Sequence, residues 1–283
     1  MTTVVPEVAH EGEAGRFRSM VDLYVTTART AVSQQFQYRT ANYFYMLGMI
    51  AEPVIYLVVW TTIADQQGGS VNGLSAGYFA AYYIVWTLVR NMNIVFGAPY
   101  WEYRIREGEL NRDLLRPMLP LHWDIAWFAG WKVVMIVLWL PIAFGLSLVF
   151  DPTLSPRPAE IVTFAIAIWG AYLIRTMLQE SLGMLCFWTT RGAAIFDLYM
   201  TVELLLSGRL VPLPLMPDWV QEISRFLPFQ WAFYFPIESL VGDLSNQELA
   251  QGLFVQLFWI LVGLAIFRVA WRTAIKHYSA VGG

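Results

Sequence analysis

Six long apolar runs divide this sequence. They cover residues 41–64, 76–97, 121–149, 159–186, 193–211 and 251–272. Each run is close to the roughly 20 mostly apolar residues that a helix needs to cross a lipid bilayer. A large soluble α/β domain would instead show short apolar strands separated by polar helices. Hydrophobic residues form 57% of the chain and charged residues only 14%, which is more apolar surface than a soluble core of this size buries. The sequence therefore predicts an all-α polytopic membrane protein with six transmembrane helices.

The placement of Lys and Arg predicts the orientation of these helices, because basic residues resist translocation and stay in the cytoplasm. With the N-terminus inside, 12 basic residues are cytoplasmic, and Lys132 near the inner part of the third run can join them. Only Arg157, Arg209 and Arg225 then fall outside. The opposite orientation would translocate most of the positive charge. We therefore expect both termini to be cytoplasmic.

The first 40 residues lack the pattern of a secretory signal. Acids stand where a signal peptide has basic residues, so no cleaved signal is expected and residues 1–15 form a polar cytoplasmic leader. Residues 16–40 place apolar and polar side chains on opposite sides of a helix. The apolar side comprises Phe17, Met20, Val21, Tyr24, Ala28, Ala31, Val32 and Phe36. This pattern predicts an amphipathic helix in the membrane interface, and a role as a mere anchor explains it equally well.

A charged segment, residues 98–120, separates the second and third apolar runs. Its stretch YRIREGELNRDLLRPMLP holds four arginines, three acids and an asparagine. Such a cluster is either a solvated loop whose arginines only enforce topology, or a docking surface for another protein. Leu110, Leu114 and Leu115 recur at helical spacing and would give a docking surface an apolar anchor.

Ionisable residues inside the apolar runs are costly unless they are paired or hydrated. Glu52 and Arg90 lie about a dozen residues from their shared loop, so they should reach the same depth and can pair. Arg175 is matched in depth to Asp197, with Glu203 within reach if the arginine extends outward. A structural clamp between neighbouring helices explains each pair better than contact with a transported solute.

Residues 212–241 are too apolar for an ordinary loop and too rich in proline for a straight helix. The prolines are Pro212, Pro214, Pro217, Pro228 and Pro236. Trp219 belongs to a helical pattern that starts behind Pro217, and a second short helix from about Phe229 to Val241 should bend near Pro236. We expect a re-entrant hairpin of two short helices that dips into the outer leaflet before the last span.

The order of these features resembles the permease subunit of an ABC-2 type exporter. Local matches are REGELNRDLLRPMLPL (106–121), SGRLVPLPLMPDWVQEISRFLPF (207–229) and the tail KHYSAVGG (276–283), and the shared topology covers nearly the whole chain. In such permeases the first cytoplasmic loop forms a coupling helix that sits in a groove of a separate ATP-binding subunit. The resemblance places in that region Arg106, Glu107, Gly108, Glu109, Leu110, Arg112, Leu114, Leu115, Arg116 and Pro117.

The resemblance also implies the partners and the division of the chain. No G-x-x-x-x-G-K-[ST] phosphate loop occurs, so ATP and Mg²⁺ should bind to a partner cassette ATPase, and this chain should hold no cofactor and no catalytic residue. The lone Cys186 and the scattered histidines predict neither a disulfide nor a metal site. Residues 41–272 would form the transmembrane domain and 273–283 a cytoplasmic tail. A second permease, identical or related, and membrane lipids are further expected partners; nucleic acid is not.

The implied function is outward movement of a hydrophobic or amphipathic solute across the plasma membrane, the bacterial inner membrane. The family's pathway usually lies where spans two and five meet their counterparts. Aromatic residues there suit a lipid-like cargo but suit lipid-facing packing equally well: Tyr82, Tyr83, Trp86, Phe96 and Tyr199. Two alternatives stay open. A secondary transporter or channel should show an internal repeat, and a membrane-embedded lipid-modifying enzyme should show a catalytic motif such as H-E-x-x-H or G-x-S-x-G; neither is visible.

Overall fold

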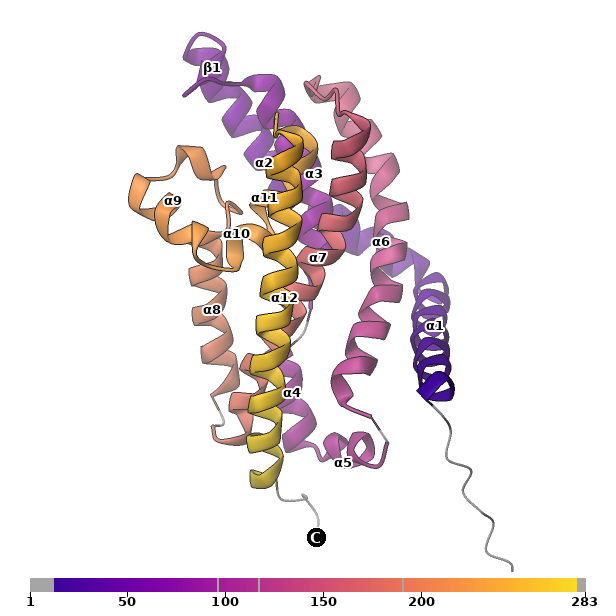
Figure 1. Cartoon of the computed structure of the whole chain (residues 1–283). Helices are drawn as coiled ribbons and strands as arrows, with labels where there is room; N and C mark the ends of the chain where they lie inside the picture. The colour runs from indigo at the N-terminus through magenta and orange to yellow at the C-terminus, as the bar shows by residue number, and fades with distance from the viewer. Residues whose placement is uncertain (1–12, 96, 117, 190, 279–283) are drawn as a thin grey trace, which may run out of the picture.

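Long helices dominate the computed structural model, which describes residues 13–95, 97–116, 118–189 and 191–278 (Figure 1). Most of the predicted leader, the end of the tail, Phe96 and Pro117 therefore lie outside the described residues. Six long helices coincide with the six apolar runs. They are α2 (Arg39–Gln66), α3 (Ala76–Met92), α6 (Pro120–Phe150), α7 (Pro158–Gly183), α8 (Gly192–Leu206) and α12 (Asn246–Ala274).

Shorter elements precede and connect these helices. The α-helices are α1 (Glu13–Gln37), α4 (Gly97–Arg106), α5 (Glu109–Leu114), α9 (Asp218–Arg225), α10 (Phe229–Ala232) and α11 (Tyr234–Val241). Three 3₁₀ helices are η1 (Met184–Phe187), η2 (Leu213–Leu215) and η3 (Ile275–His277). Strands β1 (Ser70–Val71) and β2 (Leu74–Ser75) pair antiparallel. The strands turn at Asn72 and Gly73, which both have positive φ, as a tight hairpin requires.

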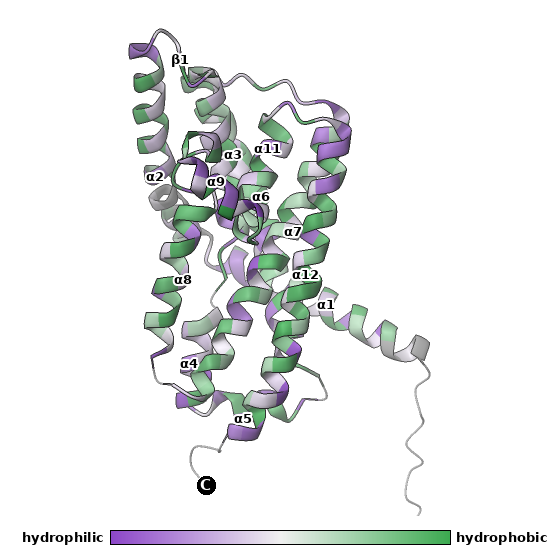
Figure 2. Cartoon of the chain, turned by 60° about the vertical axis from the view of Figure 1, so that its left-hand side comes forward, coloured by the Kyte–Doolittle hydropathy of each residue, from purple (hydrophilic) through white to green (hydrophobic). Residues whose placement is uncertain are grey.

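Two of the six helices are shorter than the apolar runs that predict them. Helix α3 ends at Met92 rather than near residue 97, and α8 ends at Leu206 rather than near 211. Among the described residues, three helical segments are long and apolar enough to cross a membrane: Pro120–Phe150, Pro158–Phe187 and Asn246–His277. The chain is thus an all-α membrane protein, with hydrophobic residues along α8 and α12 and hydrophilic residues at α5 (Figure 2).

Helix α3 lies at the centre of the fold. All but one of its residues from Phe79 to Met92 are buried, and Arg90 is half-buried. Its Tyr82, Tyr83 and Trp86 are fully enclosed and belong to the main hydrophobic cluster. Lipid-facing packing was one of the two explanations for these aromatic residues. It does not apply to these three, because their side chains contact other parts of the protein and not its surface.

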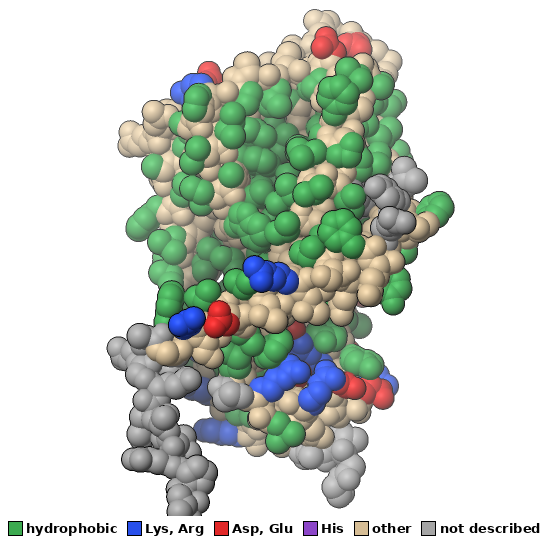
Figure 3. All heavy atoms as spheres, turned by 90° about the vertical axis from the view of Figure 1, so that its right-hand side faces the viewer, with side chains coloured by type: hydrophobic (Ala, Val, Ile, Leu, Met, Phe, Trp, Pro, Cys, Tyr) green, Lys and Arg blue, Asp and Glu red, His purple; other side chains and the backbone are tan. Residues whose placement is uncertain are grey.

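Helix α1 packs against α6 with only part of its apolar side. Ala31 is buried, and the Tyr24 hydroxyl lies 2.9 Å from Nδ1 of His122 on α6. Phe17 and Phe36 remain 72% and 63% exposed. The predicted amphipathic helix therefore forms, but it divides its apolar side between α6 and the molecular surface. Figure 3 shows that hydrophobic side chains cover the upper part of this face and that Lys and Arg gather in its lower part.

The proline-rich segment forms several short helices. Helix α9 begins at Asp218 directly after Pro217, as predicted. The predicted bend near Pro236 is confirmed, and it takes the form of a break at Phe233, between α10 and α11. Pro236 explains the break: a proline has no N–H and its ring clashes with the carbonyl four residues earlier, here that of Ala232.

Side chains from two long helices complete the hydrogen bonding of this irregular backbone. Asn93, just after α3, donates from Nδ2 to the Ala232 carbonyl at 2.6 Å. Gln256 of α12 donates from Nε2 to the Trp231 carbonyl at 2.8 Å and to the Ala167 carbonyl at 3.1 Å. An unpaired carbonyl away from water costs about 1–3 kcal/mol, so these contacts hold the segment against the long helices.

Candidate functional site

The predicted docking segment forms the two short helices α4 and α5, which lie at the same end of the molecule as the last described residues of the chain (Figure 1). The β1–β2 hairpin lies at the opposite end. Gly108 separates α4 from α5 and has φ 72°, in the left-handed region. Most side chains are strained in that conformation, so glycine permits the sharp turn that aims α5 away from the end of α4.

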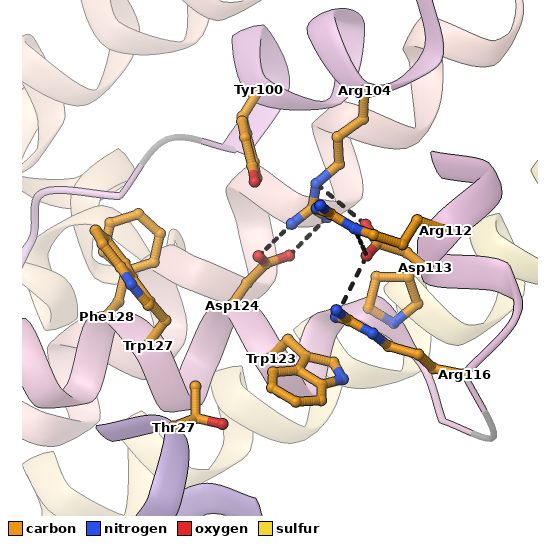
Figure 4. A pocket seen from close by; sticks show the side chains of 11 residues that line it. Thr27, Tyr100, Arg104, Arg112, Asp113, Arg116, Trp123, Asp124, Trp127 and Phe128 are labelled. Atoms are coloured by element: carbon orange, nitrogen blue, oxygen red, sulfur yellow. Dashed lines mark hydrogen bonds and ion pairs between the residues drawn. The ribbon is translucent and has the colours of Figure 1, made fainter. Parts of the chain in front are cut away.

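A buried ion pair fixes α4 to α6. Arg104 donates from Nη1 to Oδ2 of Asp124 at 2.9 Å and from Nη2 to Oδ1 of the same carboxylate (Figure 4). Its Nε also lies 3.7 Å from Oδ2 of Asp113 on α5. The side chains of Arg104, Asp113 and Asp124 are at most 9% exposed. One guanidinium therefore joins α4, α5 and the beginning of α6.

Arg104 stays charged in this position. Burial by itself lowers the pKa of Arg104, but the charge and hydrogen bonds of Asp124 outweigh burial and raise the pKa above its ordinary value. Its guanidinium also stacks over the ring of Tyr100 at 4.1 Å. A permanently charged, bidentate contact of this kind is among the strongest hydrogen-bonded pairs in proteins.

Further contacts attach the two helices to α7 and to the C-terminal segment. Trp101 of α4 donates from Nε1 to Oε2 of Glu180 on α7 at 2.6 Å. Gly183 lies so close to the Trp101 ring that an added Cβ would overlap Cδ1. Tyr278 donates from its hydroxyl to Oδ1 of Asn111 on α5 at 2.8 Å. The two short helices are thus joined to α6, to α7 and to the residue that follows η3.

The three leucines of the predicted apolar anchor differ in their exposure. Leu110 is completely buried in a cluster with Trp101, so its expected role in a docking surface is wrong. It instead holds α5 onto the chain's own core. Leu114 is 38% exposed and Leu115 is 87% exposed, which leaves Leu115 as the main apolar side chain that the segment presents.

The charged residues of α5 point mainly outward. Arg112 pairs with Glu109 at 3.2 Å, and Arg116 pairs with Asp113 at 3.4 Å. Glu107 is exposed. The remaining predicted residue of this surface, Arg106, lies 3.6 Å from Glu102 and its side chain is 65% exposed. An exposed pair such as Arg112 and Glu109 contributes little to stability, so its charges are available for a partner, whereas Asp113 is buried.

A cavity of about 280 Å³ lies between α4, α5, α1 and α6. Its lining combines guanidinium groups with aromatic rings, and Figure 4 shows Arg116 beside Trp123, with the guanidinium 4.3 Å from the ring centroid. Thr27 of α1 completes one wall. Arg112 and Arg116 both line this cavity, so part of the charge of α5 and the residues after it faces α1 and α6.

The predicted intramembrane pairs are brought together in part. Arg90 Nη2 lies 2.7 Å from Oε2 of Glu52, joining α3 to α2. Arg175 Nη2 lies 2.9 Å from Oε2 of Glu203. The first-choice partner of Arg175, Asp197, is wrong: it is exposed and, within the described part of the chain, forms no ion pair. It lies nearly two helical turns before Glu203, which is beyond reach of the arginine.

The proline positions of the hairpin do not converge on one site. Pro212 and Pro228 are buried, as is Pro236, whereas Pro214 and Pro217 are exposed. Trp219 is 61% exposed. These residues shape the segment between α8 and α12, and none of them contributes a polar group to the α4–α5 unit.

The structure thus shows a helical membrane domain with a charged pair of short helices, α4 and α5, attached to one end. The sequence pattern described as ABC-2 family transporter protein matches residues 50–282. The chain therefore belongs to the ABC-2 transporter family, whose permeases generally work with an ATPase subunit. A comparison with curated proteins found no match.

Sequence reasoning missed the residues that attach the unit to the membrane helices: Trp101, Arg104, Asp113, Asp124 and Glu180. A signal was available for two of them. Asp124 and Glu180 are acids within predicted spans, and such acids require a partner. Arg104 had no predicted role and could have been considered as the partner of Asp124. A contact between a loop and a span, however, has no fixed spacing in sequence.

Proposed function

We propose that this chain is the permease subunit of an ATP-driven exporter, which moves a hydrophobic or amphipathic solute outward when paired with a separate ATP-binding subunit. Membership of the ABC-2 family supports the class. In this account the six long helices all cross the plasma membrane, the bacterial inner membrane, with both termini inside. Residues 212–241 form a re-entrant hairpin at the outer side, and a second permease completes the pathway.

The observation that carries the proposal is the clamping of α4 and α5. The inner side of the unit is tied to α6 and α7 through Arg104–Asp124 and Trp101–Glu180. Its outer side presents Leu115 and exposed charges. A loop that only enforced topology would need its arginines but no buried contacts to α6 and α7. A unit that transmits motion from an ATPase needs both a rigid attachment and an accessible surface.

Purification of the tagged chain from its native membranes tests the proposal. We expect a cassette ATPase to co-purify, and we expect ATP hydrolysis in the complex but not in the isolated chain, since this chain has no phosphate loop. Replacing the phosphate-loop lysine of the ATPase should abolish turnover. Specific hydrolysis by the isolated chain, insensitive to changes in any ATPase subunit, would contradict the assignment.

A further inference from the structure

A second cavity, of about 370 Å³, lies beside α3, α7 and α8 and contains three arginines. Arg90, Arg175 and Arg209 line it together with mainly apolar side chains, including Val95, Phe196 and Met200. None of its lining residues is acidic. Three guanidinium groups around one small apolar space are unusual within a membrane domain, where each charge is costly unless it is paired or hydrated.

The positive charges around this cavity are not balanced by the described residues. Glu52 neutralises Arg90 at 2.7 Å, and Glu203 neutralises Arg175 at 2.9 Å. Arg209 has no such partner, because no acidic oxygen of the described chain lies within the 4.0 Å salt-bridge distance of its guanidinium. Its Nε is buried without a hydrogen-bond partner. Two acids for three arginines leave one positive charge in excess at the cavity.

The backbone holds Arg209 firmly in this position. Gly208 before it has φ 79°, a left-handed conformation that ends α8 and directs the chain back toward α3. Tyr82 then donates to the Gly208 carbonyl at 2.8 Å, and Trp86 donates to the Arg209 carbonyl at 3.0 Å. The unpaired guanidinium is therefore placed by buried contacts from the central helix, not by a loop at the surface.

We propose that this cavity binds the anionic headgroup, a phosphate or a carboxylate, of an amphipathic cargo, and that Arg209 is its principal partner. The inference rests on the proposed transport function and narrows the cargo to an anionic amphiphile. Guanidinium groups bind such oxyanions through paired N–H donors. The neighbouring Val95, Phe196 and Met200 give the attached alkyl chain an apolar surface.

Binding is tested on the full chain in nanodiscs of phosphatidylcholine, without any ATPase. The probe is dodecyl phosphate, and dodecylphosphocholine is the zwitterionic comparison with the same chain length. Wild-type protein should prefer dodecyl phosphate. Arg209→Gln should weaken its binding by about 10- to 100-fold, because one charge-assisted contact is lost. Arg209→Lys should retain part of the affinity, since it keeps the charge but loses the planar pair of donors.

Arg225→Gln is the matched control, because Arg225 is an exposed arginine of the proline-rich segment that follows Arg209 and does not line the cavity. It should bind dodecyl phosphate as the wild type does. Equal affinities of wild type and Arg209→Gln, or equal binding of the two amphiphiles by the wild type, would overturn the inference. A cooperative thermal unfolding transition like that of the wild type shows that each variant is folded.

A transport assay then separates a cargo from a resident membrane lipid. Proteoliposomes that contain the chain and its ATPase should translocate labelled dodecyl phosphate when ATP is supplied, and Arg209→Gln should lose this movement. Binding without any ATP-dependent movement would overturn the cargo assignment and identify a resident lipid. If no ATPase associates with the wild type, the proposed function fails, whereas the binding comparison still decides whether the cavity takes an anion.

Discussion

Arg104 and Asp124 form a bidentate, almost fully buried ion pair that joins α4 to the beginning of α6. The pair connects the part of the chain that a partner can reach with a helix long and apolar enough to cross the membrane. It is therefore a direct, buried contact between the proposed coupling unit and the transmembrane helices.

A double-mutant cycle measures this connection. Arg104→Leu or Asp124→Leu alone should lower the free energy of unfolding by about 3–5 kcal/mol, because each leaves one buried charge without its partner. The double variant should lose much less than the sum of the two single losses. Chemical unfolding in detergent micelles gives the three values.

The exposed pair of Arg112 and Glu109 provides the comparison for that cycle. Leucine replacements there should show a coupling of about 0–1 kcal/mol, as expected for surface ion pairs. Additive losses at Arg104 and Asp124 would mean that the two side chains do not act as a pair.

Close packing between α4 and α7 gives a second prediction. Gly183→Ala places a Cβ where Trp101 lies and should force the indole away from Glu180, at a cost of about 1–3 kcal/mol. Thermal unfolding should show the lower stability, and ATP hydrolysis by the complex should become less dependent on cargo.

Gly145→Ala is the matched replacement, because no atom outside the local helix backbone lies within 4 Å of the position that a Cβ would occupy there. It should leave stability unchanged or raise it slightly, since alanine is the better helix former. Equal effects at positions 145 and 183 would refute the importance of the Trp101 contact.

Topology can be tested by cysteine labelling in a Cys186→Ser background. Asp218 and Glu222 are exposed on α9, which the proposed topology places outside the cell. Arg112 and Lys276 are exposed in segments that it places in the cytoplasm. Cysteines at the first two positions should react with an impermeant thiol reagent added to intact cells. Cysteines at the other two should react only after permeabilisation. Labelling in the reverse order would overturn the proposed orientation.

The sequence predicted the long helices well because each apolar run reports on its own surroundings. The prediction was less accurate at the helix ends, because contacts with other parts of the chain determine where a helix stops. Helix α8 stops early because the turn at Gly208 is held by hydrogen bonds from Tyr82 and Trp86 of α3. The break at Phe233 follows from Pro236, but its exact place depends on Asn93, which supplies the donor that the Ala232 carbonyl accepts.

At the candidate site, too, the sequence alone did not predict contacts with distant segments. The charged segment was visible as a cluster in the sequence, yet helical spacing could not tell that Leu110 faces the chain's own Trp101 cluster while Leu115 faces outward. The sequence likewise offered Arg175 two acids on α8, and the structure selects Glu203, because Asp197 lies nearly two helical turns away and is exposed. The periodicity of the sequence does not predict which side chains from distant segments come into contact.

The central claim, that α4 and α5 dock onto a separate ATPase, is tested most directly by the affinity of the ATPase for charge-altered permeases. Replacing Glu107 and Glu109 together with lysine reverses two charges on the docking side without changing a buried residue. Asp218→Lys combined with Glu222→Lys makes the same change in net charge on exposed residues of α9. Membrane insertion of each variant is checked in parallel, and acids contribute little to it.

The dissociation constant of the ATPase, measured on purified permease in nanodiscs, decides the matter. Like charges at a complementary interface cost several kcal/mol, so the Glu107 and Glu109 double variant should bind at least about 30-fold more weakly than the wild type. The α9 variant should bind as the wild type does. Wild-type affinity in the Glu107 and Glu109 double variant, with normal insertion, would contradict docking through this surface.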